Sequence, residues 1–181
     1  MHRNILPTLA VLILLPAQTL SAATRTWDGG GDGQSWQNAT NWVGDTLPAT
    51  GDDVIINVAG TNATIVYSGS NLTLRSLQCE ETFSLAAGDL TVTNVSWANG
   101  GLTIAARRTL NVMGAAASFT ASGTINVTGA SLSARNGGSL SLPTLGSYQD
   151  SNVCCGALLE ANGAGSSLNL SGLTNLTGDV T

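Results

Sequence analysis

The sequence predicts an all-β fold: a right-handed parallel β-helix, or β-solenoid, with a Trp-rich capping segment at its N-terminal end. Apolar residues recur in pairs two positions apart, each followed by Gly, Asn, Ser or Ala, and this alternation is typical of half-buried strands. Only 9% of the residues are charged and 22 are Gly, which suits strands whose outer faces carry Ser, Thr and Asn. The pairs are Leu72/Leu74, Leu90/Val92, Leu110/Val112, Ile125/Val127, Leu140/Leu142 and Leu168/Leu170.

An antiparallel β-sandwich is the alternative fold, because short strands separated by turn signals also fit it. The chain lacks Asn-Gly-type two-residue hairpin loops flanked by strands of equal length, and this favours the solenoid. Ala-rich stretches such as 114–118 are too short for a stable helix, so we expect almost no helix in the mature chain.

Residues 1–23 have the composition of a cleavable signal peptide. Arg3 precedes an apolar stretch over 5–15, and the small residues at 21–23 suit a signal peptidase, so we expect cleavage between Ala23 and Thr24. A membrane-spanning helix needs about 20 apolar residues, whereas two prolines and a glutamine interrupt this much shorter run. The sequence therefore predicts a secreted or cell-surface protein with no transmembrane segment after cleavage.

The charge of the chain argues against a nucleic-acid partner. All six basic residues are Arg, and Arg3 leaves with the signal peptide. The mature chain then carries five Arg against eleven Asp and Glu, a formal charge of −6. An acidic surface without Lys disfavours both nucleic acid and anionic lipid.

Residues 24–53 form a segment rich in Trp, Gly and Asp that differs from the rest of the chain. Trp27, Trp36 and Trp42 lie within sixteen positions of one another. We interpret the segment as a cap, because the first coil of a solenoid exposes an apolar end and open strand edges. In the alternative interpretation the same three indole rings are exposed and stack on sugar rings as a carbohydrate-binding surface.

The order of residues in this segment resembles the entry segment of exported bacterial β-solenoid proteins, including autotransporter passenger-like and autotransporter-associated repeat proteins. The shared elements are Trp27-Asp28-Gly-Gly-Gly-Asp32-Gly, Trp36, Asn41-Trp42, Leu47-Pro48 and Asp52-Asp53-Val54. Residues 138–145 and 159–178 look like coils of the same group. The resemblance implies a fold and an exported location. Members of such groups serve as adhesins, surface layers or carriers of other domains, so it implies no single activity.

Asp28 and Asp32 are candidate calcium ligands, because Ca²⁺ binds carboxylate and carbonyl oxygens. Their spacing fits neither the helix–loop–helix calcium loop nor the Gly-rich calcium-binding repeat. Asp and Gly at this density are more typical of turns. We therefore expect no cofactor, with calcium as the alternative.

Residues 54–181 are predicted to form the coils. Two interleaved sets of apolar pairs are spaced by 17 to 20 residues, as expected for two sides of one coil. The intervals then shorten to 15 beyond Leu110 and lengthen to 28 between Leu140 and Leu168, which we interpret as an inserted loop near 148–156. Because the rhythm continues to the last residue, we expect a longer natural protein or a truncated gene product.

Cys79, Cys154 and Cys155 are the disulfide candidates in an oxidising compartment. A bond from Cys79 to either of the other two would clip the inserted loop to an earlier coil. Coils stacked about 4.8 Å apart separate these residues unless the loop folds back. A bond between the adjacent pair would be strained, so buried or loosely paired structural thiols are the simplest interpretation. Three thiols without His leave a zinc site incomplete.

Most groups needed for catalysis are missing. The only His is His2, in the signal peptide, and Lys is absent, which removes Ser-His-Asp, Cys-His and Schiff-base chemistry. The acids after Val54 do not recur at the coil spacing, so they form no acidic stripe of the kind a polysaccharide hydrolase or lyase needs.

We therefore predict a non-catalytic, exported β-solenoid, structural or adhesin-like, whose partners are surface glycans or other proteins. The alternative is a carbohydrate-binding module, or the N-terminal part of a polysaccharide-active β-helix protein.

Overall fold

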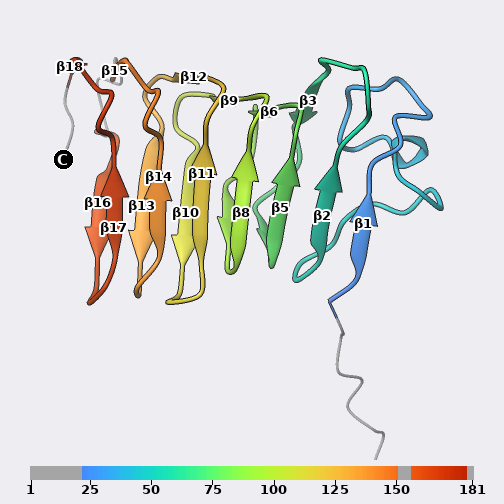
Figure 1. Ribbon diagram of the computed structural model, residues 1–181, viewed down its shortest axis with the longest axis horizontal. Helices are drawn as coiled ribbons and strands as arrows, with labels where there is room; N and C mark the ends of the chain where they lie inside the picture. The colour runs from blue at the N-terminus through green and yellow to red at the C-terminus, as the bar shows by residue number, and fades with distance from the viewer. Residues whose placement is uncertain (1–21, 151–155, 179–181) are drawn as a thin grey trace, which may run out of the picture.

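The computed structural model of the chain describes residues 22–150 and 156–178 and is a parallel β-helix (Figure 1). Short strands follow one another around three sides of a coil, and each strand pairs with a strand of the next coil. All strand pairs among the described residues are parallel, which excludes the antiparallel sandwich. The predicted signal peptide lies outside the described residues, except for its last two positions.

The strands form one sheet on each side of the coil. The first side is a seven-stranded sheet made of β1 (Thr24–Thr26), β2 (Asp53–Ile56), β5 (Ser76–Cys79), β8 (Val95–Ala98), β11 (Ser118–Ala121), β14 (Ser139–Ser141) and β17 (Ser167–Asn169). The second side contains β3 (Thr64–Tyr67), β6 (Thr82–Leu85), β9 (Gly101–Ile104) and β12 (Thr124–Val127). The third side contains β4 (Leu72–Leu74), β7 (Leu90–Val92), β10 (Thr109–Met113), β13 (Ser131–Arg135) and β16 (Leu159–Asn162).

Two further elements complete the described chain. A small parallel sheet joins β15 (Ser147–Gln149) to β18 (Asn175–Thr177). The 3₁₀ turn η1 (Ala39–Asn41) is the only helical element among residues 22–150 and 156–178, and none of these residues lies in a helix long and apolar enough to cross a membrane.

The core consists of apolar side chains stacked in register from coil to coil. The third side shows this most clearly, with one inward column of Leu72, Leu90, Leu110, Leu132 and Leu159 and a second of Leu74, Val92, Val112, Ala134 and Ala161. Burying each large aliphatic side chain contributes roughly 1.5–3 kcal/mol. The alternation in the sequence therefore predicted these strands correctly, because every second residue points into the coil.

The predicted coil spacing was partly wrong. Along the third side, the register partners Leu72, Leu90, Leu110, Leu132 and Leu159 lie 18, 20, 22 and 27 residues apart, so the coils lengthen. The apparent shortening to 15 arose because Ile125 lies on the second side and Leu140 on the first. Each coil has three sides, and the interleaved sets mixed residues from different sides.

The predicted insertion falls in a long coil. There β15 is a short strand rather than a loop, with Tyr148 buried and its hydroxyl donating to the carbonyl of Ala130 at 2.5 Å. Residues 151–155 of the predicted loop lie outside the described residues.

The segment between β1 and β2 caps the first coil by bonding to the first strand of every side. On the first side, β1 pairs with β2. On the second, the Trp36 N–H donates to the Val66 carbonyl at 3.0 Å; on the third, the Gly51 N–H donates to the Thr73 carbonyl at 2.9 Å. The cap therefore covers strand edges that would otherwise be open to other chains.

Candidate functional site

The three Trp residues of the cap are buried. Trp27, Trp36 and Trp42 are only 3%, 2% and 1% exposed. Trp42 packs edge-to-face on both other rings, with centroids 5.0 Å from Trp27 and 4.8 Å from Trp36, and Trp36 also contacts the rings of Tyr67 and Phe83. Stacking on a sugar needs an exposed ring face. The structure therefore contradicts the carbohydrate-stacking alternative for these three residues, which form the interior of the cap.

A buried amide, Asn41, organises the loop beneath these rings. Asn41 is fully buried, and its Oδ1 accepts from the N–H groups of Gly31 and Gly33 at 3.0 and 2.9 Å. Its Nδ2 donates to Asp32 Oδ1 at 2.7 Å and to the Ser35 carbonyl at 2.9 Å. In the sequence, Asn41 stands out only as part of the Asn41-Trp42 pair, and its role in the loop was not predicted.

Asp28 and Asp32 hold turns. Asp28 Oδ1 accepts from the Gly30 N–H at 2.9 Å. Hydrogen bonds from the side chains of Ser35 and Asn41, and from the N–H groups of Ser35 and Gln34, hold the pKa of Asp32 well below its usual range. No group of three or more potential metal ligands occurs in the part of the chain that the structure describes.

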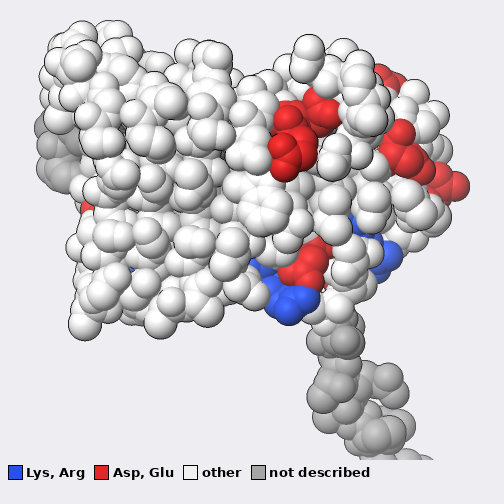
Figure 2. All heavy atoms as spheres, in the orientation of Figure 1, with Lys and Arg blue, Asp and Glu red and all other residues white. Residues whose placement is uncertain are grey.

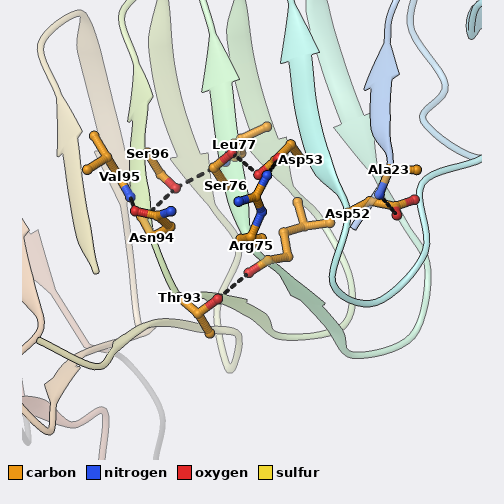
Figure 3. Close-up of polar contacts among 11 residues, drawn as sticks. Ala23, Asp52, Asp53, Arg75, Ser76, Leu77, Thr93, Asn94, Val95 and Ser96 are labelled. Atoms are coloured by element: carbon orange, nitrogen blue, oxygen red, sulfur yellow. Dashed lines mark hydrogen bonds and ion pairs between the residues drawn. The ribbon is translucent and has the colours of Figure 1, made fainter. Parts of the chain in front are cut away.

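Asp52 closes the cap at the other end of the segment. Its carboxylate accepts from the Ala23 and Ala49 N–H groups and from Arg25 Nε, each at 3.0 Å. Figure 3 shows Asp52 beside Ala23 at the edge of the first side. These contacts fix the start of β1 against the turn that precedes β2.

Cys79 is a free, buried thiol in the core of the first side. Its Sγ donates to the Glu81 carbonyl at 3.2 Å, and burial raises the pKa of Cys79 to about 12. A thiol with this pKa is protonated at neutral pH and unreactive. The other two disulfide candidates, Cys154 and Cys155, lie outside the described residues.

The outer faces of the sheets carry rows of small polar side chains in register. Towards the C-terminal end of the first side, Ser167 Oγ donates to Ser139 Oγ at 2.9 Å, and Asn169 Nδ2 donates to Ser141 Oγ at 3.0 Å. On the third side, the outward row is Thr73, Thr91, Asn111, Ser133 and Glu160. On the first side these side chains hydrogen-bond to one another across coils, and the outer faces are mainly polar.

A groove of about 410 Å³ runs along the third side. Asn111 lies in it, and its Oδ1 is buried without a hydrogen-bond partner, the only such side-chain atom among the described residues. At the edges of the groove, Asp89 accepts from the Thr109 N–H at 2.8 Å, and Arg135 forms an ion pair with Glu160. The groove is therefore lined mainly by hydroxyl and amide groups, with its cation already paired.

A second groove, of about 290 Å³, lies on the first side over β2, β5 and β8. Arg75 and Asp53 form an ion pair there, and Ser76 Oγ donates to Asp53 Oδ1 at 2.6 Å (Figure 3). Ile55, Gln78, Asn94 and Val95 also line it. Its walls therefore carry apolar side chains from two strands, Ile55 on β2 and Val95 on β8.

Trp97, which was not predicted as a site residue, lies next to the second groove. It points outward from β8 and is partly exposed, unlike the three Trp residues of the cap. Its register partner on β5 is Gln78, a groove residue. A signal was present in the sequence, because Trp97 is the one Trp outside the cap segment.

Comparison with known proteins adds no relative: no family model, no curated protein and no solved structure matches the chain.

Proposed function

We propose that the protein is an exported, non-catalytic β-solenoid of the surface or adhesin-like kind, which binds partners on its outer faces. The observation that carries this proposal is the arrangement of those faces: rows of mainly polar side chains in register over successive coils. Stacked repeats of this kind present extended, rigid binding surfaces.

The inward and outward residues of the strands have different roles, and this supports the proposal. The inward columns of aliphatic and aromatic residues stabilise the coil, and the backbone ladders satisfy the peptide groups. The outward residues contribute little to the core, so their chemistry is available for recognition. Each coil extends the faces by about 4.8 Å.

The charges of the molecule favour short-range recognition. Figure 2 shows charged atoms over the N-terminal half of the first side and a nearly uncharged surface over its C-terminal half. Three Arg are already paired with Asp or Glu, in Arg25–Asp52, Arg75–Asp53 and Arg135–Glu160. Partners are therefore recognised through hydrogen bonds and small apolar contacts rather than through long-range electrostatic attraction.

Export is tested by expressing the full chain with a C-terminal tag in a bacterial host. We expect an intact mass corresponding to a chain that starts at Thr24, outside the cytoplasm. A charged residue in the apolar stretch, Ile13→Arg, should keep the chain unprocessed inside the cell, because it breaks the signal peptide. An unprocessed cytoplasmic wild-type chain would contradict the proposal.

Partner binding is tested with the purified mature chain, which carries a fluorescent label on an added tag without Cys. Binding to intact bacterial cells should saturate and should be displaced by unlabelled protein. Binding that never saturates, or that unlabelled protein does not displace, would mean that the faces recognise nothing specific.

A further inference from the structure

Strand β8 faces the opposite way from its sequence pattern. In Val95-Ser96-Trp97-Ala98, the alternation predicts that Val95 and Trp97 point into the core. The structure buries Ser96 and Ala98 instead, leaves Val95 52% exposed and turns Trp97 outward. The register with β5, which pairs Trp97 with Gln78, holds the strand in this orientation.

The reversed orientation places a hydroxyl in the core, where it needs partners. Ser96 Oγ accepts from the Leu77 N–H at 3.0 Å and donates to the Asn94 carbonyl at 3.1 Å (Figure 3). In this orientation the strand does not bury Val95 and Trp97, so it loses the stabilisation that their burial in the core would contribute. A strand that breaks its local pattern while its neighbours support it is typical of a functional site.

The outward Trp97 is held by a polar network that spans three coils. Trp97 Nε1 donates to Glu80 Oε1 at 3.0 Å, and Asn99 Nδ2 donates to both Glu80 oxygens at 3.1 Å. Ser122 Oγ in turn donates to Asn99 Oδ1 at 3.1 Å. Glu80 is exposed and belongs to none of the ion pairs in the described structure, so its carboxylate is oriented but not neutralised.

The second groove continues the same surface. Val95, two residues before Trp97 on β8, and Gln78, its neighbour on β5, both line the groove, together with Ile55 and Asn94. An aromatic ring, two aliphatic side chains and several amide and carboxylate groups therefore share one face.

We propose that this face, over β2, β5 and β8, is a binding site for a neutral glycan, with Trp97 as the stacking residue and Glu80 as an oriented acceptor of sugar hydroxyls. The inference rests on the proposed function and names the class of partner. A sugar ring has an apolar C–H face, which fits an indole, and hydroxyl groups, which fit fixed acceptors. Glu80, which forms no ion pair in the described structure, and the net charge of −6 on the mature chain disfavour an anionic glycan.

A protein partner fits this face less well. Stable protein interfaces bury about 800 Å² on each partner and have an apolar centre. Here the apolar part is limited to Ile55, Val95 and Trp97, and serines and threonines border it at Ser76, Ser118 and Thr120. A narrow amphipathic ligand is the better match.

The test titrates the full mature chain with neutral gluco-, xylo-, manno- and chito-hexaoses, followed by Trp fluorescence and calorimetry. We expect saturable binding to at least one of them with a change in Trp emission, because Trp97 is the partly exposed indole. Trp97→Ala should weaken that binding about tenfold or more, and Glu80→Gln should weaken it by a smaller factor. Met113→Ala, a matched truncation of an exposed apolar residue on the third side, should leave it unchanged.

Folding of Trp97→Ala is checked by circular dichroism. As a measurement on the wild type, the hexaose should protect one Trp from oxidation by N-bromosuccinimide, mapped to position 97 by mass spectrometry. Failure of all four hexaoses to bind, or equal binding by Trp97→Ala, would overturn the inference. If saturable cell binding persists in either case, the proposed function stands and the glycan site alone is lost.

Discussion

Asn41 shows how much of the cap depends on one side chain. Its amide satisfies the N–H groups of Gly31 and Gly33 and also links to Asp32 and Ser35, all within a loop that has little regular secondary structure. A Cβ at Gly31 would lie 2.9 Å from Asn41 Oδ1 and 2.3 Å from Thr40 Oγ1, so the glycine is required for this close approach. The Gly run and the Asn-Trp pair of the sequence therefore belong to one structural unit.

We predict that Asn41→Leu lowers the free energy of unfolding by about 2–4 kcal/mol, because it leaves buried N–H groups without acceptors. Urea unfolding followed by Trp fluorescence measures the change. The matched variant Asn62→Leu, at an exposed position in the loop before β3, should cost less than about 1 kcal/mol. Equal losses in the two variants would contradict this account.

The lowered pKa of Asp52 makes the stability of the folded chain depend on pH. Burial raises the pKa of Asp52, but hydrogen bonds from Ala49, Arg25 and Ala23 outweigh that effect, so its pKa in the folded chain lies below its usual value. A carboxyl whose pKa is lowered on folding stabilises the protein above its unfolded pKa, and this stabilisation is lost as the pH falls through the folded pKa.

We therefore expect Asp52→Asn to reduce the difference in unfolding free energy between about pH 6 and about pH 3 relative to the wild type. Urea titrations at the two pH values measure it. An unchanged difference in the variant would show that Asp52 contributes nothing to acid sensitivity.

At the scale of elements, each turn between the first and second sides packs directly against the same turn of the preceding coil. A Cβ at Gly123 would lie 2.6 Å from the backbone of Asn99 and Gly100, and a Cβ at Gly100 would lie 2.5 Å from the backbone of Glu80 and Glu81. These distances are too short for any side chain. Glycine is required at both positions by the backbone of the preceding coil, not by its own backbone conformation.

Gly123→Ala is predicted to destabilise the protein by about 1–3 kcal/mol, because the neighbouring turn must move to admit the methyl group. Thermal unfolding followed by circular dichroism measures the effect. Gly146→Ala is the matched control, since a Cβ at Gly146 meets nothing within 4 Å. A similar loss of stability in both variants would show that the cost comes from glycine content rather than from stacking.

The orientation of strand β8 could not be predicted from its sequence. Its existence follows from β-forming residues between turn residues, but its orientation does not follow from its own alternation. Ser96 and Ala98 point inward because Ala98 pairs with Cys79 of the preceding coil and with Ala121 of the next. The orientation is imposed by partners about twenty residues away in the chain, which a local pattern does not contain.

At the scale of the whole molecule, the cap and the coils form one continuous core. Trp36 contacts Trp42 within the cap and also Tyr67 and Phe83 on β3 and β6. The cap therefore does more than cover strand edges: it extends the apolar stack beyond the first coil. In a stacked repeat protein, loss of a terminal cap exposes both apolar surface and open strand edges.

We expect Trp36→Ala to lower the free energy of unfolding by about 3–5 kcal/mol and to promote self-association through the uncovered end. Urea unfolding and size-exclusion chromatography with light scattering measure the two effects. Trp97→Ala, which removes an indole from the outer face, should change stability much less. A Trp36→Ala chain as stable and monomeric as the wild type would contradict the capping role.

Period-two apolar pairs predicted the parallel β-helix and most of the inward columns, and the Trp, Gly and Asp residues of 24–53 predicted the cap. Those features are local, because an extended backbone directs alternate residues to opposite faces wherever the strand lies. The number of sides, the register, the burial of Trp27, Trp36 and Trp42 and the outward position of Trp97 emerged only once the coils were stacked. They depend on contacts between different segments of the chain, such as those of Trp36 with Tyr67 and Phe83, and burial is a property of those contacts rather than of any single strand.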